Sequence, residues 1–365
     1  MPEPFKNVFN RHFVDSLAHA LQQHYHAFPH DAFLHAVFDE TWDSRELKDR
    51  MRHITHRLRA TLPQPYPHAL AILRAAAPHS VTDGYGLAAM VFPDFVEVYG
   101  LDHWDESLAA LEQFTQQSSA EFAVRPFIMR DKPRMMAHML MWAQHANHHL
   151  RRLASEGCRP RLPWAMALPA FKADPSPILP ILDTLKNDES EYVRRSVANN
   201  LNDIAKDNPQ VTLDVLRVWN QQPTPAIASI TRHALRTLVK SGDMQALALL
   251  GYERAAVTIE DLQVTPQQIS LGDELTFSCE VVSQYDAPQA VEIDYVIHFA
   301  RANGKSNAKV FKLTRKTLAP HERLMLRRRH SFRPVTTRRY YAGEHALEIQ
   351  VNGEILAHVR FSLID

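Results

Sequence analysis

The spacing of apolar residues divides the chain into two parts. Up to about Leu250, apolar side chains recur every three or four positions, which predicts amphipathic helices. Breaks rich in Pro and Gly, such as residues 157–163, divide this part into roughly ten to twelve short helices. After about Val257 apolar and polar residues alternate, which predicts short strands. We therefore expect a helical domain over residues 1–254 and an all-β domain over residues 255–365.

The pattern of the second part is typical of an immunoglobulin-like sandwich. Alternation is clear in residues 275–281 (LTFSCEV) and 291–299 (VEIDYVIHF), and Asn352-Gly353 marks a turn. About seven such strands fit into roughly 110 residues, as that fold requires. Cys279 stands alone, so the Cys–Trp–Cys pattern of antibody domains is absent.

Part of the helical domain repeats. Residues 188–209 (DESEYVRRSVANNLNDIAKDNP) combine an acidic start, an apolar stripe and a stop at Asp-Asn-Pro. A similar stripe returns at residues 230–238, where Arg232 stands 38 positions after Arg194. That interval is close to the roughly 40–47 residues of HEAT and armadillo repeats. The sequence thus predicts a HEAT-like helical-repeat solenoid whose concave face binds a partner.

Composition narrows the class of protein. The 365 residues are 45% hydrophobic, which is typical of a folded chain of two domains. No apolar stretch reaches the ~20 residues of a membrane span, and the first ten residues do not resemble a signal peptide. Cys158 and Cys279 form no disulfide framework. We expect a cytoplasmic protein without membrane contact.

Lys and Arg together number 41, as do Asp and Glu, so the net charge of the chain does not indicate a nucleic-acid partner. The distribution does, because residues 301–339 hold 13 basic residues and a single acid, Glu322. This run indicates a polyanion contact, although a solvated strand face remains an alternative. The arginines that we single out in it are Arg327, Arg328, Arg329, Arg338 and Arg339.

Residues 118–127 (SSAEFAVRPF) contain the first candidate carboxylate, Glu121. Ser118 and Glu121 have the spacing of a capping box, and Arg125 has the spacing of a helical ion pair with Glu121. A structural role for Glu121 is therefore one interpretation. The other is a carboxylate that faces a binding groove.

The helix predicted around residue 200 supplies the second candidate carboxylate. Ser196, Asn199 and Asp203 share one face, while the apolar stripe occupies another. Asp203 then projects away from the apolar core, either into the concave face or into solvent.

The third candidate region is residues 151–164, which contain Glu156. Two prolines prevent a regular helix around Arg159, Arg161 and Trp164, so a loop can present these side chains. Arginine suits phosphate contact, and an aromatic ring can stack on a base. The alternative is a repeat connector with Trp164 packed beneath it.

Other chemistry lacks support in the sequence. His145 and His149 have i, i+4 spacing, but no metalloprotease glutamate accompanies them and we expect surface histidines. No phosphate-binding glycine loop or nucleophilic triad motif occurs. We expect no metal and no cofactor.

Three segments together resemble the AlkC-type DNA glycosylases of bacterial alkylation repair, which are relatives of the AlkD group. They are residues 121–127 (EFAVRPF), residues 159–164 (RPRLPW) and residues 196–209 (SVANNLNDIAKDNP). The order of a HEAT-like region followed by an immunoglobulin-like module is also similar, and the resemblance covers essentially the whole chain.

This resemblance implies a metal-independent glycosylase that removes cationic alkylated bases, chiefly 3-methyladenine, from duplex DNA. A cationic base already leaves readily, so carboxylates need only stabilise oxocarbenium-like charge and place a water. The implied catalytic residues are Glu121, Asp203 and Glu156. The implied DNA contacts are Trp164, Arg152, Arg159, Arg161, Asn199 and the five arginines of residues 301–339.

Two other classes of protein remain open. One is a non-catalytic DNA-binding scaffold, in which Glu121 and Asp203 are structural. The other is a protein-binding HEAT-like adaptor with an immunoglobulin-like arm. In the glycosylase interpretation the chain is a monomer with no obligate protein partner.

Overall fold

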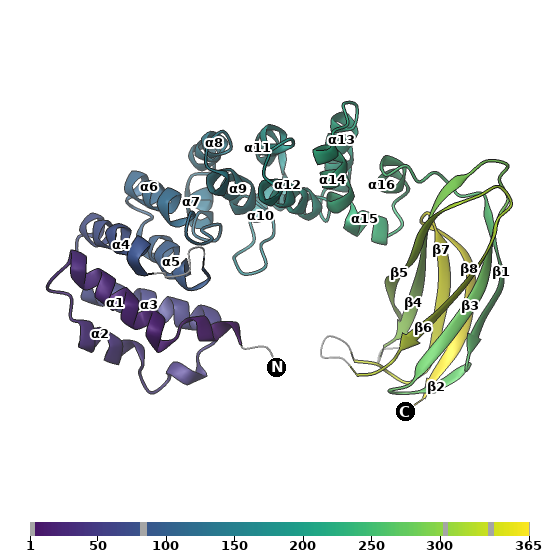
Figure 1. Cartoon of the computed structure of the whole chain (residues 1–365), viewed down its shortest axis with the longest axis horizontal. Helices are drawn as coiled ribbons and strands as arrows, with labels where there is room; N and C mark the ends of the chain where they lie inside the picture. Colours follow the sequence, from purple (N-terminus) through teal and green to yellow (C-terminus); the bar gives the residue numbers. More distant parts are fainter. Residues whose placement is uncertain (1–3, 81–85, 302–305, 335–338, 365) are drawn as a thin grey trace. The chain divides into compact units, whose positions relative to one another are not determined.

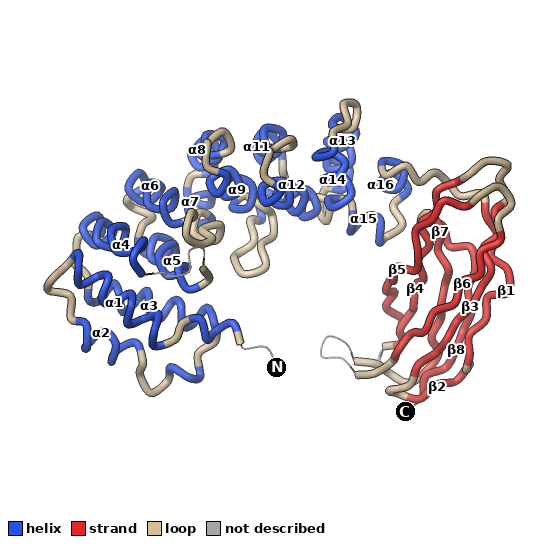
Figure 2. The backbone as a smooth tube through the Cα atoms, viewed as in Figure 1, coloured by secondary structure: helices blue, strands red, loops and turns tan. Residues whose placement is uncertain are grey.

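The computed structural model describes residues 4–80, 86–301, 306–334 and 339–364. Helices occupy the chain up to Leu249, and strands follow from Val257 to Ile364 (Figures 1 and 2). The predicted fold class, a helical region followed by an all-β domain, is confirmed.

The helical region consists of short helices joined by turns, as the breaks in the apolar pattern predict. None in the described ranges has the length and apolar character needed to cross a bilayer. The α-helices are α1 (Arg11–His24), α2 (His30–Val37), α3 (Leu47–Thr61), α4 (Tyr66–Ser80), α5 (Val91–Tyr99), α6 (Trp104–Phe114), α7 (Arg125–Arg130), α8 (Lys132–Trp142), α9 (His148–Gly157), α10 (Pro169–Ala173), α11 (Leu179–Leu185), α12 (Glu191–Ile204), α13 (Pro209–Trp219), α14 (Pro225–Ala234), α15 (Arg236–Lys240) and α16 (Met244–Leu249). Short 3₁₀ turns are η1 (Phe5–Val8), η2 (Trp42–Ser44), η3 (Ala88–Met90) and η4 (Ser176–Ile178).

Helix α1 shows how the local sequence sets the packing. The Asn10 side chain accepts a hydrogen bond from the backbone N–H of Phe13 at 2.9 Å and so caps the helix. Val14, Leu17 and Leu21 recur at helical spacing and are fully buried. Their face packs α1 against α2 and α4, and farther along the chain α9 packs against α12 (Figure 1).

Two sheets form the β domain. One has the order β1-β3-β6 and the other the order β2-β8-β7-β4-β5, with every pair antiparallel except β2 and β8. The strands are β1 (Val257–Thr265), β2 (Gln268–Ser270), β3 (Glu274–Ser283), β4 (Gln289–Ala300), β5 (Ser306–Leu318), β6 (Arg323–Ser331), β7 (Gly343–Val351) and β8 (Glu354–Ile364).

Alternating residues fill the core between the sheets. Phe277 and Cys279 of β3 and Ile293 and Ile297 of β4 are almost completely buried, two positions or multiples of two apart.

Cys279 and Cys158 both carry free thiols. Burial raises the pKa of the Cys158 thiol to about 12, which keeps it protonated and unreactive at neutral pH.

Contacts divide the chain into two compact units. The first comprises residues 1–208 with 224–230, and the second comprises residues 209–223 with 231–365. Helices α13, α15 and α16 therefore group with the strands rather than with α1 to α12. The candidate carboxylates all lie in the first unit.

Candidate functional site

Three carboxylates from separate segments gather between α9 and α12. Glu121 lies in the turn before α7, Glu156 near the end of α9, and Asp203 near the end of α12. Two arginines, Arg152 and Arg159, connect them through a continuous chain of ion pairs. The structure thus brings together the three residues that the family resemblance implies as catalytic.

Arg159 bridges two of these carboxylates. Its Nη1 donates to Glu156 Oε1 at 2.6 Å, and its Nε and Nη2 both approach Asp203 Oδ2, at 2.8 and 2.7 Å. Lys206 donates to the other oxygen of Asp203 at 2.7 Å. The side chain of Arg159 is only 10% exposed and that of Asp203 only 2%. Buried charges persist when each is paired in this way.

Polar residues of α9 and α12 surround the Glu156 oxygen that Arg159 does not bind. Ser196 donates its hydroxyl to Glu156 Oε2 at 2.6 Å and lies 3.1 Å from the Ser155 hydroxyl. Asn200 donates to the backbone carbonyl of Ser155 at 2.8 Å. Both oxygens of Glu156 therefore accept short hydrogen bonds, which fixes the orientation of its carboxylate.

Arg152 links Glu156 to Glu121. Its Nη1 donates to Ser119 Oγ at 2.9 Å and to Glu121 Oε2 at 3.3 Å, while its Nη2 lies 3.7 Å from Glu156 Oε1. The guanidinium also lies 4.6 Å from the centroid of the Tyr192 ring, in a cation–π contact. Arg152 is thus held in place by α9, α12 and the turn that carries Glu121.

Glu121 has the highest exposure and the weakest pairing of the three carboxylates. Its side chain is 16% exposed, against 7% for Glu156 and 2% for Asp203. Burial raises the pKa of the Glu121 carboxyl, the charge of Glu156 adds to this, and Arg152 opposes it.

The capping interpretation of Glu121 does not fit this geometry. Helix α7 begins only at Arg125, after Val124, and the Glu121 carboxylate turns instead to Arg152. Arg125 is fully buried and does not form the predicted ion pair, because its Nε donates to the Met166 carbonyl at 2.6 Å and its Nη1 to the Gly157 carbonyl at 3.0 Å.

Helix α12 corrects a second interpretation. The face that carries Asp203 is buried against α9, so it is not a solvated surface. Asn200 is buried in that seam, whereas Asn199 is only partly buried. The sequence pattern predicts a single buried face for this helix, so Asn200 is not among the predicted site residues. In the structure α12 is buried on two sides, and Asn200 lies on the second of them.

The loop after α9 presents its aromatic residue. Trp164 is 49% exposed and meets the Phe5 ring edge-on, with 6.4 Å between centroids. Arg161 forms an ion pair with Asp207. Its side chain is more exposed than that of Arg152, and the side chain of Arg159 is the least exposed of the three. Because about half of its side chain is exposed, Trp164 is not packed beneath the loop.

Three consecutive arginines of the basic run lie on β6. Arg327, Arg328 and Arg329 are exposed and line a surface hollow of about 520 Å³. Arg339 stacks 5.4 Å from the centroid of the Tyr341 ring, and Arg338 lies outside the described residues. The exposure of these side chains is compatible with the predicted polyanion contact.

The histidine pair singled out in the sequence does not share a helix face. His145 lies in the turn before α9, where its Nδ1 accepts the backbone N–H of Asn147 at 2.9 Å, and His149 lies inside α9.

Comparison with known proteins agrees with these observations. Residues 48–238 match the DNA alkylation repair enzyme family, and residues 258–365 match the C-terminal Ig-like domain of the uncharacterised protein YhaZ. The chain is 46% identical to YhaZ of Bacillus subtilis (strain 168) over 359 residues, which is 98% of this chain and 99% of that protein.

A solved structure covers both domains. The alkylpurine DNA glycosylase AlkC of Pseudomonas fluorescens, bound to DNA containing an abasic site analog, aligns over 100% of both chains with a TM-score of 0.92 and 40% identity. Matched over its helical region and over its whole length, the chain belongs to the DNA alkylation repair enzyme family, in the AlkC-type form that ends in an Ig-like domain.

Proposed function

We propose that this protein is a monofunctional DNA glycosylase that hydrolyses the N-glycosidic bond of cationic alkylated bases, chiefly 3-methyladenine, in duplex DNA. The observation that carries the proposal is the gathering of Glu121, Glu156 and Asp203 around Arg152 and Arg159. The likeness to a glycosylase bound to DNA containing an abasic site analog supports the same reaction class. We expect it to act as a monomer in the cytoplasm.

Excision of a cationic base requires no general acid. A base that carries a positive charge departs as a neutral molecule, so the enzyme has no proton to supply. As the bond breaks, positive charge grows on the deoxyribose, and a fixed carboxylate nearby lowers the energy of that state. A carboxylate also accepts a proton from the attacking water. The proposed site holds three such groups and requires no cofactor.

The contacts suggest different roles for the three carboxylates. Glu121 is the most exposed and its ion pair is with Arg152, so we assign it to the lesion and the attacking water. Asp203 and Glu156 are bonded to Arg159, Lys206 and Ser196, and we assign them to the fixed array of charges behind Glu121. A field from side chains that need not reorganise is the efficient form of electrostatic catalysis.

Arg152 and Arg159 take a different role from the one expected from sequence. Because both point into the carboxylate cluster, we propose that they position Glu121, Glu156 and Asp203 rather than bind phosphates. Arg161 and the exposed Trp164 are better placed for DNA contact. For the β domain, the exposed arginines of β6 supply the proposed phosphate contacts.

The proposal is tested by the bases that the protein releases. Purified protein is incubated with duplex DNA that carries 3-methyladenine, and separately with duplex that carries a neutral lesion, both with EDTA, and free bases are resolved by chromatography. We expect release of 3-methyladenine and not of the neutral lesion. No release of either base, with salt-sensitive duplex binding intact, would leave a non-catalytic DNA-binding scaffold.

A further inference from the structure

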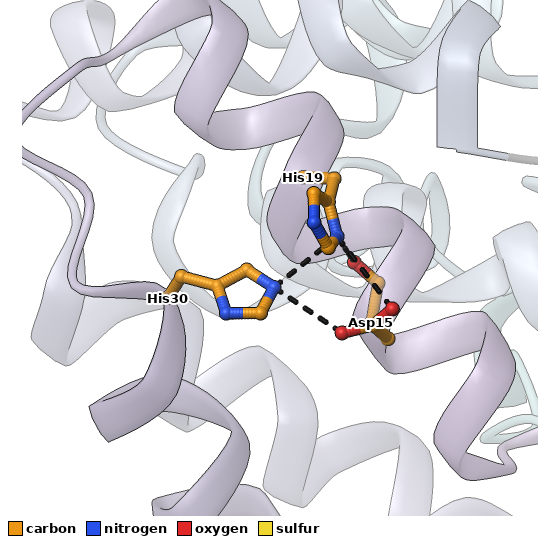
Figure 3. A group of neighbouring side chains, drawn as sticks. All are labelled: Asp15, His19 and His30. Atoms are coloured by element: carbon orange, nitrogen blue, oxygen red, sulfur yellow. Dashed lines mark hydrogen bonds and ion pairs between the residues drawn. The ribbon is translucent and has the colours of Figure 1, made fainter.

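A second polar cluster lies between α1 and α2, apart from the carboxylate site. Asp15 and His19 project from α1 at i, i+4 spacing, and His30, the first residue of α2, points toward both (Figure 3). The side chain of His30 is 16% exposed, that of Asp15 is 44% exposed and that of His19 is 61% exposed. Each residue offers one ligand atom, and these atoms lie within 4.8 Å of one another.

The distances inside this cluster match those between ligands of one metal ion. His30 Nε2 lies 3.2 Å from His19 Nδ1 and 3.2 Å from Asp15 Oδ1, and His19 Nδ1 lies 3.6 Å from Asp15 Oδ2. A tetrahedral zinc ion with bonds of roughly 2.0–2.1 Å separates its N and O ligands by about 3.3 Å. The two contacts with Asp15 involve different carboxylate oxygens, so ligation through a single oxygen requires a small rotation of this half-exposed side chain.

The outer side of His30 is arranged as in known metal sites. Its Nδ1 lies 2.9 Å from a carboxylate oxygen of Asp31, which accepts an N–H in the tautomer that carries the proton on Nδ1. A neutral ring held in this tautomer directs the lone pair of Nε2 toward Asp15 and His19. Carboxylate–histidine–metal arrangements orient ligands in the same way.

Without a cation, this tautomer is unfavourable. The lone pair of His30 Nε2 would face a carboxylate oxygen of Asp15, and both are acceptors. The other tautomer, in which Nε2–H donates to Asp15, or a metal ion at Nε2 resolves the conflict. His19 Nδ1 also lies 2.9 Å from the Asp15 carbonyl, a hydrogen bond that ligation would replace.

We propose that Asp15, His19 and His30 bind one divalent transition-metal ion of the zinc type, with water as the remaining ligand. Nitrogen and carboxylate ligands of this composition suit zinc better than magnesium or calcium. The ion connects α1 to the start of α2, across the turn formed by residues 25–29. The proposed role is structural, and it is independent of the glycosylase proposal.

The test is zinc binding by the full-length protein after chelator treatment, measured by competition with a chromogenic chelator and by thermal unfolding. We expect one zinc ion to bind and to raise the Tm. His30→Gln should abolish this binding, and Asp31→Asn should weaken it about tenfold or more. Cobalt in place of zinc should give the visible absorption of a tetrahedral site with nitrogen ligands.

The control is His35→Gln, the same substitution at an exposed position of α2. It is needed because the chain contains 21 histidines and some will bind zinc weakly. Equal zinc affinity in wild type and His30→Gln would overturn the proposal. Equal losses in His30→Gln and His35→Gln would also overturn it. If His30→Gln does not fold, Asp15→Asn takes its place, because Asp15 is half-exposed on a helix surface.

Discussion

Arg159 and Asp203, 44 positions apart in the sequence, form a buried ion pair in which two guanidinium nitrogens approach one carboxylate oxygen at 2.8 and 2.7 Å. The same guanidinium also binds Glu156, so one positive charge lies between two carboxylates that would otherwise repel one another. This pair makes the carboxylate cluster part of the packing between α9 and α12. If the proposed function is correct, Arg159 serves both the stability of the fold and the arrangement of the site.

Removal of Arg159 should weaken the fold. Arg159→Ala leaves Glu156 and Asp203 buried without their shared partner, and we expect the free energy of unfolding to fall by about 3–5 kcal/mol in denaturant titrations. Arg195→Ala is the control, because Arg195 forms an exposed pair with Glu191 whose removal should cost less than about 1 kcal/mol. Equal stability of the two variants, with a smaller salt dependence of DNA binding for Arg159→Ala, would instead make Arg159 a phosphate ligand.

Glu121 should destabilise the protein at neutral pH. Its pKa is raised in the folded state, so the folded protein binds this proton more tightly than the unfolded chain does. The stabilisation that comes from this tighter proton binding is present at low pH. It is lost as the pH rises from the ordinary glutamate pKa of 4.5 through the raised pKa of Glu121. At pH 7 we expect Glu121→Gln to unfold at a Tm equal to or above that of wild type, with the difference shrinking as the pH falls toward 4.5.

The matched control for this measurement is Glu191→Gln, on the exposed face of α12. A Tm of Glu121→Gln well below that of both wild type and Glu191→Gln at pH 7 would show that the ionised carboxylate stabilises the fold, as a helix cap would.

Loss of charge at Asp203 should slow catalysis. Asp203→Asn keeps the shape of the side chain but removes negative charge next to Arg159 and Lys206, and we expect excision to fall by at least ~100-fold, or ~2.7 kcal/mol of barrier. Asp183→Asn on α11 is a suitable control, because Asp183 pairs with Lys186 at the surface. Rates are compared per folded molecule, under single-turnover conditions. Equal rates for the two variants would remove Asp203 from the catalytic account.

The arginines of β6 should act through phosphates. Replacing Arg327 and Arg329 together by Ala should weaken duplex binding whatever the sequence. It should also reduce the slope of log K against log salt by about 0.9 for each phosphate that the variant no longer neutralises. Arg360→Ala is the control on β8, where Arg360 pairs with Glu344. An unchanged slope in the double variant would place the DNA-binding surface elsewhere.

Much of the architecture could be predicted from the sequence, because it depends on periodicity. The change from three- and four-residue spacing to alternation marks the transition from helix to strand, and the stripe of Val197, Leu201 and Ile204 forms the core side of α12. The three carboxylates are identifiable by their polar positions and by resemblance to a family. Periodicity does not say which distant segments meet, so the pairing of Arg159 with Asp203 could not be predicted.

Two particular cases show this limit. Arginines next to prolines suit a phosphate contact and a buried ion pair equally well, and only the packing of α9 on α12 turns Arg159 inward. Likewise Asp15 and His19 have visible i, i+4 spacing, but the position of His30 depends on the path of the turn before α2. In both cases the decisive partner lies on another element.

The most direct test of the glycosylase account is single-turnover excision of 3-methyladenine from duplex DNA by wild type, Glu121→Gln and Glu191→Gln, in EDTA. Glu121 is the most exposed of the three carboxylates, so its charge should matter most at the reacting sugar. We predict at least a ~100-fold slower rate for Glu121→Gln and a wild-type rate for Glu191→Gln. Excision at the wild-type rate by correctly folded Glu121→Gln would contradict the account.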